Sequence, residues 1–410
     1  MKKIVYIVLL FVLVACEDKY ELTHRWSRPH TGQRMYPIYL DAREILVDIQ
    51  IRPPFNPQNA FKIVSNDKYI FVGSDVGIHV FKKDDGFPLN FIQINHLKAF
   101  DIVGNLLFAS NFVDLLVIDV EDPANARILH RERDFFNRYI NSGFNLPVVH
   151  NQSINANVYE IGQKWVNVTV TITDANPDPD FSEVDEYYRS FTVTQIHQHI
   201  PHAVHQDIQL HGRPHVGIIN VEGNIYTLGN NGLMRLSYTS GGLTTSQSSN
   251  IPDYWQVMPT SNLQYKDGMV FIIGNSGFVH LDYPNQNSTF RQWWGVMDVV
   301  SIQVPANSFV VLGNTILSLL DAPGGMGGTW GATSIINVDD TILALGSALT
   351  LHRLSWQENW WSWVFQQVGL YQNISGRAML REGDRLFVAH SWQGLFVYDI
   401  SDLDNIILIQ

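Results

Sequence analysis

Histidines are concentrated in one short part of this 410-residue chain. The segment QIHQHIPHAVHQDIQLHGRPH, residues 195–215, holds six of the 15 histidines. His197 and His199 would point two imidazoles to one face of a strand, because side chains alternate along a strand. His202 would supply a third nitrogen, and Asp207 or a water molecule would complete a tetrahedral set. The pattern suggests a zinc site, and packed or solvent-facing histidines are the alternative.

An acidic segment, DANPDPDFSEVDE, precedes the histidines at residues 174–186. Its oxygen-bearing side chains fall on the ligand positions of an EF-type calcium loop: Asp174, Asn176, Asp178, Asp180, Ser182 and Asp185. Calcium requires several oxygens that converge on one point, and such a loop normally turns sharply at a central glycine. Pro179 stands at that central position, and the flanking segments read as strands rather than helices. Two interpretations stay open, a calcium site or a solvated acidic hairpin tip.

Tryptophans crowd into two stretches, RQWWGV and SWQENWWSWVF. An exposed tryptophan on an outer strand often forms the energetic centre of a protein interface or a platform for a sugar ring. Packing between neighbouring sheets is the alternative for these side chains. The interface candidates are Trp293, Trp294, Trp360, Trp361 and Trp363.

Catalytic motifs are missing from the sequence. It contains no Gly-x-Ser-x-Gly nucleophile elbow and no His-Glu-x-x-His metal motif. Carboxylate pairs of the glycosidase type stay open, because distant segments can bring such pairs together. We therefore predict no catalytic residue.

Two segments that alternate Val, Thr and aromatic residues with polar ones flank the acidic segment. They are KWVNVTVTIT at residues 164–173 and YYRSFTVTQI at residues 187–196. Alternation of this kind predicts strands, and the pair predicts one long β-hairpin. Both strands belong to an insertion, residues 134–215, that interrupts a repeated pattern.

The repeated pattern covers residues 44–410 and consists of short apolar strands separated by turn residues. The second strand of each unit ends at Val72, Phe108, Leu228, Ile273, Leu312, Leu345 and Val388. A period of about 40 residues is typical of propeller blades, which bury their faces only by stacking around an axis. The sequence predicts an all-β propeller of about seven blades, with eight as the alternative. EILVDIQI, residues 44–51, could supply a strand that completes the last blade.

Two units carry a more specific signature. The segments LLVIDVEDPANA (residues 115–126) and LFVYDISDLDNI (residues 395–406) resemble LVIVD repeats, in which an apolar strand ends in Asp and enters a D-P-x-N turn. The second copy has Leu403 in place of the usual proline. The resemblance implies a propeller of the kind found in bacterial surface and secreted proteins, and it implies no shared catalytic chemistry.

The start of the chain resembles the export signal of a bacterial lipoprotein. Two lysines precede an apolar run, residues 4–15, that is too short to span a bilayer as a helix. The sequence LVAC at residues 13–16 resembles a lipobox, which is cut directly before its cysteine. The resemblance implies that residues 1–15 are a signal peptide and that Cys16 is the lipid attachment site.

The residues behind the cysteine indicate where the protein is displayed. Glu17 and Asp18 resemble the surface-export signal of Bacteroidota lipoproteins, although Lys19 interrupts the acidic run. We expect an outer-membrane protein that faces the cell exterior, with a periplasmic orientation as the alternative. Residues 16–43 contain prolines and glycine and suggest a lipidated tether.

Charge and composition narrow the partners. With 27 basic and 39 acidic residues, the formal net charge of −12 makes nucleic acid an unfavourable partner. Membrane contact is therefore expected through the lipid anchor, and the single cysteine excludes an internal disulfide.

These features favour a non-catalytic scaffold for protein contacts, an accessory subunit of an outer-membrane uptake, secretion or assembly complex. Its expected partners are outer-membrane proteins. The alternative is a surface enzyme or a binding protein for glycans or peptides, dependent on zinc or calcium.

Overall fold

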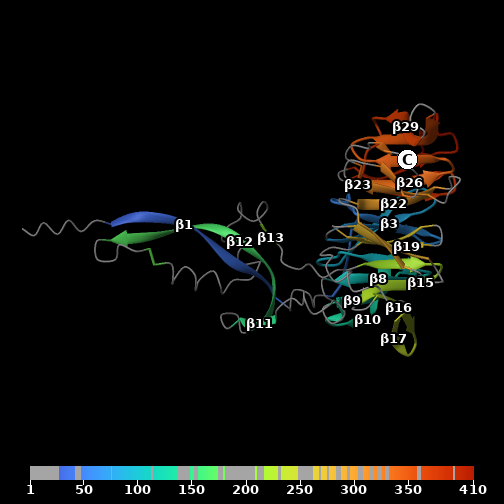
Figure 1. The fold of residues 1–410 in the computed structure, drawn as a ribbon. Helices are drawn as coiled ribbons and strands as arrows, with labels where there is room; N and C mark the ends of the chain where they lie inside the picture. The colour runs from blue at the N-terminus through green and yellow to red at the C-terminus, as the bar shows by residue number, and fades with distance from the viewer. Residues whose placement is uncertain are drawn as a thin grey trace, which may run out of the picture. The chain divides into compact units, whose positions relative to one another are not determined.

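The computed structural model is an all-β protein (Figure 1). The residues that it describes are 27–41, 48–74, 76–111, 114–136, 148–151, 156–173, 179–180, 208–209, 217–229, 232–247, 262–266, 269–274, 277–282, 288–292, 296–302, 308–313, 317–320, 326–327, 332–357, 362–390 and 393–410. The described residues include a short 3₁₀ turn, η1 (Pro123–Asn125). No helix in the described part of the chain is long and apolar enough to cross a membrane.

The chain divides into two compact units. The first holds most of one sheet, whose strands are β1 (Ser27–Asp41), β11 (Val148–Asn151), β12 (Ala156–Thr173) and β13 (Ile208–Gln209). β12 lies between β1 and β11 and also pairs with β13. Within this sheet the hydroxyls of Thr31 and Thr169 lie 2.8 Å apart.

This sheet alters two sequence interpretations. The segment expected to be a tether, residues 16–43, contains β1, a strand that pairs with β12. Residues 164–173 form a strand as predicted, but the strand begins earlier, at Ala156. The expected hairpin partner, residues 187–196, lies outside the described residues.

The second unit holds the repeated sheets, numbered here in chain order. Sheet 1 contains β2 (Gln50–Arg52), β3 (Lys62–Ser65), β4 (Tyr69–Ser74), β5 (Gly77–Lys82) and β6 (Pro88–Gln93). Sheet 2 contains β7 (Phe100–Val103), β8 (Leu106–Asn111), β9 (Asp114–Asp119) and β10 (Arg127–Glu132). Sheet 3 contains β14 (Ile218–Val221), β15 (Asn224–Gly229), β16 (Gly232–Thr239) and β17 (Gly242–Gln247).

The later sheets repeat this order. Sheet 4 contains β18 (Asn262–Lys266), β19 (Met269–Gly274), β20 (Gly277–Asp282) and β21 (Ser288–Gln292). Sheet 5 contains β22 (Val296–Ile302), β23 (Ser308–Gly313), β24 (Leu317–Leu320) and β25 (Met326–Gly327). Sheet 6 contains β26 (Ser334–Val338), β27 (Thr341–Leu345), β28 (Leu349–Gln357) and β29 (Ser362–Tyr371). Sheet 7 contains β30 (Ala378–Glu382), β31 (Arg385–His390), β32 (Gly394–Asp399) and β33 (Ile407–Leu408).

The first strands of these sheets form a closed cycle of contacts. β3 contacts β7, and the contacts continue through β14, β18, β22, β26 and β30. β30 then contacts β3, so the C-terminal sheet lies beside the N-terminal one (Figure 1). Neighbouring strands within each sheet are antiparallel, and each follows the other in the chain apart from β2. This propeller-like arrangement confirms the predicted all-β architecture of small antiparallel sheets.

Packing between sheets explains why their strands are apolar on both faces. In β9 every residue from Leu115 to Ile118 is buried, because one face meets sheet 1 and the other meets sheet 3. Gly73 in β4 must lack a side chain, since a Cβ there would overlap the ring of Phe100 in β7. The core therefore lies between the sheets rather than within a single layer.

The described part of residues 44–51 does not complete the last sheet as expected. The described part of that segment contributes to β2, which pairs with β6 as a fifth, outer strand of sheet 1. Sheet 7 instead obtains its outer strand from β33, the segment that follows β32 in the chain. Each sheet of the cycle is thus built from one continuous stretch of the chain. Because the first and last sheets share no strand, side-chain contacts between them close the cycle.

Candidate functional site

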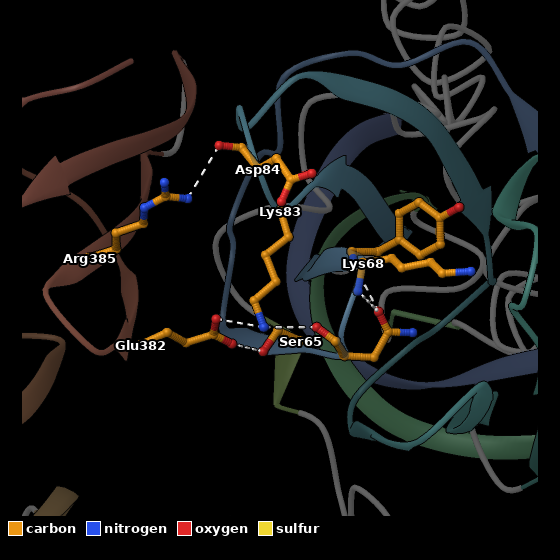
Figure 2. A network of polar contacts seen from close by, with 8 residues as sticks. Ser65, Lys68, Lys83, Asp84, Glu382 and Arg385 are labelled. Carbon is orange, nitrogen blue, oxygen red and sulfur yellow. Dashed lines mark hydrogen bonds and ion pairs between the residues drawn. The ribbon is translucent and has the colours of Figure 1, made fainter.

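The contact between sheets 7 and 1 closes the cycle and contains a network of polar side chains. The ammonium Nζ of Lys83 lies 2.6 Å from Oε2 of Glu382 and donates to the carbonyl of Asn66 at 2.9 Å. Ser65 donates its hydroxyl to the other oxygen of the same carboxylate. Figure 2 shows Glu382 bound by both partners, which come from sheet 1.

Two further contacts extend this seam. Asn66 accepts the backbone amides of Lys68 and Tyr69 at 3.0 and 2.8 Å, which fixes the turn between β3 and β4. Arg385 of sheet 7 donates to the carbonyl of Asp84 at 3.2 Å (Figure 2). Because Lys83 and Glu382 are each about one-quarter exposed, solvent weakens their ion pair, and it contributes about 1 kcal/mol or less.

An apolar cluster supports the polar seam. Its buried members are Ala60, Ile63, Ile70, Val72 and Phe81 beside or in sheet 1, and Ala378, Phe387, Ala389, Leu395 and Val397 in sheet 7. Burial of apolar surface contributes about 25 cal/mol per Å², so this cluster outweighs the exposed ion pair as a source of stability. The polar contacts define the register of the two sheets.

Similar side-chain links join the inner strands elsewhere in the cycle. Nζ of Lys62 in β3 lies 2.6 Å from the carboxylate of Asp101 in β7 and donates to the carbonyl of Ile218 in β14 at 3.0 Å. Asn220 in β14 donates to the carbonyl of Ile102 in β7 at 2.8 Å. The first three sheets are therefore tied at their inner strands, and Lys62 is engaged in structure rather than left for a ligand.

The root of the insertion is held by a buried carboxylate. Asp114, at the start of β9, accepts the backbone amide of Asp134 at 2.9 Å and pairs with the guanidinium of Arg131 at 3.3 Å. Asp134 has a positive φ of 52° and begins the chain's departure from β10. Phe135 and Phe136 follow and are buried in the apolar cluster between sheets 2 and 3. The insertion therefore begins from a fixed point.

Burial controls the charge of this carboxyl. Desolvation raises the pKa of Asp114, while the amide of Asp134 and the charge of Arg131 act in the opposite direction. A buried carboxylate with two donors is stable only while both donors stay in place.

The two LVIVD-like tails adopt the same turn. In the first, Asp122 accepts the amide of Ala124 at 3.1 Å and the side-chain amide of Asn125 at 2.7 Å. In the second, Asp402 accepts the amide of Asp404 at 2.9 Å. A short polar side chain thus caps the backbone of each turn.

Each tail also docks on the sheet that precedes it. Asn90 in β6 donates to the carbonyl of Pro123, and the hydroxyl of Tyr371 in β29 donates to the carbonyl of Leu403 at 2.7 Å. Pro123 and Leu403 occupy equivalent places in the two tails. Each tail therefore links the outer strand of one sheet to the next sheet, and the residues of the D-P-x-N pattern have a structural role.

A serine–histidine pair in sheet 1 also has a structural role. Nδ1 of His79 donates to the carbonyl of Phe55 at 3.1 Å, and Nε2 faces the hydroxyl of Ser74 at 3.2 Å. Both side chains are fully buried, so a substrate does not reach the hydroxyl. Burial lowers the pKa of His79 to about 4, which makes the ring a weak base near neutral pH.

Most of the sequence-predicted site residues lie outside the described residues. This holds for Cys16, His197, His199, His202, Asp174, Asn176, Asp178, Asp185, Trp293, Trp294, Trp360 and Trp361. Asp180 is described and exposed. Within the described residues no group of three or more His, Cys, Asp or Glu side chains is placed to hold a metal ion.

One interface candidate can be placed on a strand. Trp363 lies in β29, opposite Trp356 of β28. The β28–β29 ladder runs past β27, whose pairing with β28 ends at Arg353. The two tryptophans therefore stand on the part of the hairpin that continues beyond the rest of sheet 6.

Sequence reasoning missed the residues that close the cycle. Lys83 and Glu382 are separated by most of the chain, so no local spacing connects them. Tyr371 carries a weak signal, because it is an aromatic residue at the end of the outer strand that precedes the last unit. Asp114 stands where the third strand of a unit begins, a place at which a charged residue interrupts the apolar pattern.

Comparison with known proteins yields no family. No protein-family model and no curated protein matches the chain. Among solved structures, Kluyveromyces lactis Hsv2 is 8% identical, with 78% of this chain and 99% of that chain covered and a TM-score of 0.34. AztD from Citrobacter koseri, in its apo form, is 9% identical, with 83% and 95% covered and a TM-score of 0.41. A chain of the mitotic checkpoint complex is 10% identical, with 86% and 95% covered and a TM-score of 0.48. Similarity this low does not assign the fold, which is described from the sheets of this chain alone.

Proposed function

We propose that this chain is a non-catalytic, lipid-anchored outer-membrane protein whose β-propeller is a scaffold for protein contacts. It faces the cell exterior and serves as an accessory subunit of a complex for uptake, secretion or assembly. The observation that carries the proposal is the closed cycle of sheets, from which an insertion departs at a point fixed by Asp114. A closed cycle of packed sheets that carries an inserted segment is suited to hold partners in a defined geometry.

The propeller in this proposal has seven blades and belongs among LVIVD-repeat proteins. Seven blades agree with the cycle of contacts from β3 to β30, which needs no eighth sheet among the described residues. Family membership is supported by the equivalent turns at Asp122 and Asp402 and by the matching hydrogen bonds to the carbonyls of Pro123 and Leu403.

The anchor is tested by metabolic labelling with a palmitate analogue. The proposal expects label on the wild-type protein and none on Cys16→Ala. Protease added to intact cells should then digest the wild-type protein, because the proposal displays it outside. Labelling of Cys16→Ala, or protection of the wild type until the outer membrane is opened, would contradict the anchor or the orientation.

The scaffold function is tested by gentle detergent extraction of the tagged, full-length protein from its own outer membrane. The expected result is a membrane protein that co-purifies at a fixed stoichiometry in independent preparations. Metal content is measured in the same sample. A protein recovered alone with near one equivalent of zinc or calcium would overturn the scaffold function, and loss of the metal in His197→Ala would then direct attention to metal-dependent chemistry.

A further inference from the structure

Most of the large apolar side chains that the described residues expose lie in β29, in or beside β33, and in the turn between β5 and β6. They are between 48% and 55% exposed, and they are Phe87, Val368, Leu370, Ile407, Leu408 and Ile409. Single exposed apolar residues are ordinary, but a contiguous group on a monomer marks an interaction surface. We call these six residues the apolar rim.

Two contacts join the segments that carry the rim. The hydroxyl of Tyr371, at the end of β29, donates to the carbonyl of Leu403 at 2.7 Å and accepts the amide of Ile406 at 3.4 Å. On the other side, a Cβ added to Gly86 would lie 3.0 Å from Val397 in β32. The end of β29 therefore meets the start of β33, and the turn before Phe87 packs against the same sheet.

The outer edge of β33 has free backbone positions. Ile407 pairs with Asp399 and Leu408 with Tyr398, and the amide of Ile409 donates to the carbonyl of Val397 at 2.8 Å. Consecutive residues of a strand direct their amides and carbonyls to opposite sides, so those of Leu408 point away from β32. No strand of the described residues pairs with this edge. An apolar edge of this kind is a template for another strand.

Sheet 1 shows what kind of strand such an edge accepts. Its outer strand β6 is covered by β2, which is antiparallel to it and has the sequence Gln50, Ile51, Arg52. Ile51 packs against the core cluster of sheets 1 and 2, while Gln50 and Arg52 are exposed. β2, the strand that covers β6, thus has an apolar centre and a basic end, and we use it as the guide for a strand that would cover β33.

Charge favours the same chemistry. Exposed carboxylates border the rim on both sides of Phe87 and β33: Asp84, Asp85, Asp402 and Asp404. Lys82, whose ammonium lies 5.9 Å from the centre of the Phe87 ring, and Arg385, which donates to the carbonyl of Asp84, offset only part of this charge. Basic flanks on a partner would be attracted here, whereas a second copy of a chain with net charge −12 would be repelled.

We infer that the apolar rim is the docking surface for an extended segment of a partner protein, with alternating apolar residues and basic flanks. The segment adds to the outer edge of β33 as β2 adds to β6, and its apolar side chains lie against Leu408, Leu370 and Phe87. This inference rests on the proposed scaffold function, since it identifies the surface and the chemistry of the contact. β-strand addition of this kind combines backbone hydrogen bonds with side-chain pockets.

The test uses the purified full chain and a synthetic seven-residue peptide of alternating isoleucine and lysine. The matched control peptide alternates isoleucine and glutamate. We expect the lysine peptide to protect the amides of residues 405–410 from hydrogen exchange, and the glutamate peptide to bind at least tenfold more weakly. Leu408→Ser should weaken binding of the lysine peptide at least tenfold. Val76→Ser removes an apolar side chain of similar exposure from the turn between β4 and β5, outside the rim, and should leave binding unchanged.

Several outcomes would overturn the inference. They are equal binding of the two peptides, unchanged binding to Leu408→Ser, and protection confined to other strands. Sedimentation velocity of the free chain adds another, because a dimer that Leu408→Ser abolishes would make a second copy the occupant.

Co-purification separates this inference from the proposed function. If the membrane partner binds Leu408→Ser as well as the wild type, the scaffold function stands and the rim is not its contact. If the peptide binds at the rim but no partner co-purifies, the rim is a docking surface and the accessory-subunit function fails.

Discussion

Buried histidines make the stability of this protein depend on pH. Burial lowers the pKa values of His79 and His352 from 6.5 to about 4 in the folded chain. Between these values the unfolded chain binds more protons than the folded one, so acidification lowers the free energy of unfolding. Each histidine accounts for a loss of about 3 kcal/mol by the time the pH reaches its folded pKa.

We therefore predict that urea unfolding shows constant stability above pH 7 and a steep loss between pH 6.5 and pH 4. His79→Gln should flatten part of this loss, because glutamine takes up no proton in either state. The slope of the urea transition should stay the same in both proteins. A variant whose stability falls with pH as steeply as that of the wild type would show that His79 is not responsible.

Asp114 supports a second prediction at the scale of a residue. Asp114→Ala removes the acceptor of the Asp134 amide and leaves Arg131 without this carboxylate, so we expect a loss of about 2–3 kcal/mol. Asp114→Asn keeps an acceptor for the amide and should lose less. Hydrogen exchange at residues 134–136 distinguishes the two, since only the alanine variant should expose these amides. Equal exchange in both variants would contradict this account of the insertion's root.

The LVIVD-like tails are the elements whose sequence and structure agree best. Asp122 and Pro123 form the first tail turn with the amide of Ala124 bound to the aspartate, and Asp402 forms the second in the same way. Such turns are local, because a short polar side chain reaches only its own neighbouring amides. For that reason the sequence alone predicts them.

This equivalence leads to a prediction for the second tail. Leu403→Pro should be neutral or should stabilise the protein by up to about 1 kcal/mol, because proline fixes the backbone that Pro123 already adopts in the first tail. The carbonyl of residue 403 would still accept from Tyr371. Thermal unfolding measures the change, and Leu403→Gly is the control that should destabilise. A proline variant that melts well below the wild type would show that the two turns differ in backbone conformation.

Two elements show where local reasoning fails. β1 contains Pro29, Gly32 and Pro37, which suggest an irregular tether, yet it is a strand at the edge of its sheet. An edge strand can hold prolines, since one side of its backbone needs no partner in the sheet. The sequence of β2 is compatible with a strand in sheet 1 or in sheet 7. Only the three-dimensional arrangement of β6 and β33 decides which of the two sheets it extends.

At the scale of the whole molecule, the period of the repeats predicts stacked sheets but not the contacts that close them. Lys83 and Glu382 belong to the first and last sheets, and their pairing depends on the complete cycle. The predicted metal and tryptophan sites lie mostly outside the described residues. Strand periodicity fixes which residues share a face of a sheet, but it does not say which distant segments meet, so spacing alone does not bring such side chains together.

Closure of the cycle leads to the last prediction. Each sheet of a closed cycle packs against two neighbours, so a cavity at one seam should weaken the whole unit rather than one sheet. Phe387, fully buried between sheets 7 and 1, is one of the two phenylalanines of that seam cluster, with Phe81. Phe387→Ala should cost about 3–5 kcal/mol, and Phe87→Ala, which removes an exposed ring, should cost less than about 0.5 kcal/mol.

Urea unfolding followed by tryptophan fluorescence and by far-ultraviolet circular dichroism measures this cost. In Phe387→Ala both signals should shift together to lower urea, because sheets that share two seams each unfold as one cooperative unit. An open stack of sheets behaves differently, since each sheet depends mainly on its nearest neighbours and unfolding can begin at an end. Two separated transitions in this variant would therefore mean that the seam between sheets 7 and 1 is a weak contact and that the cycle is not closed in solution.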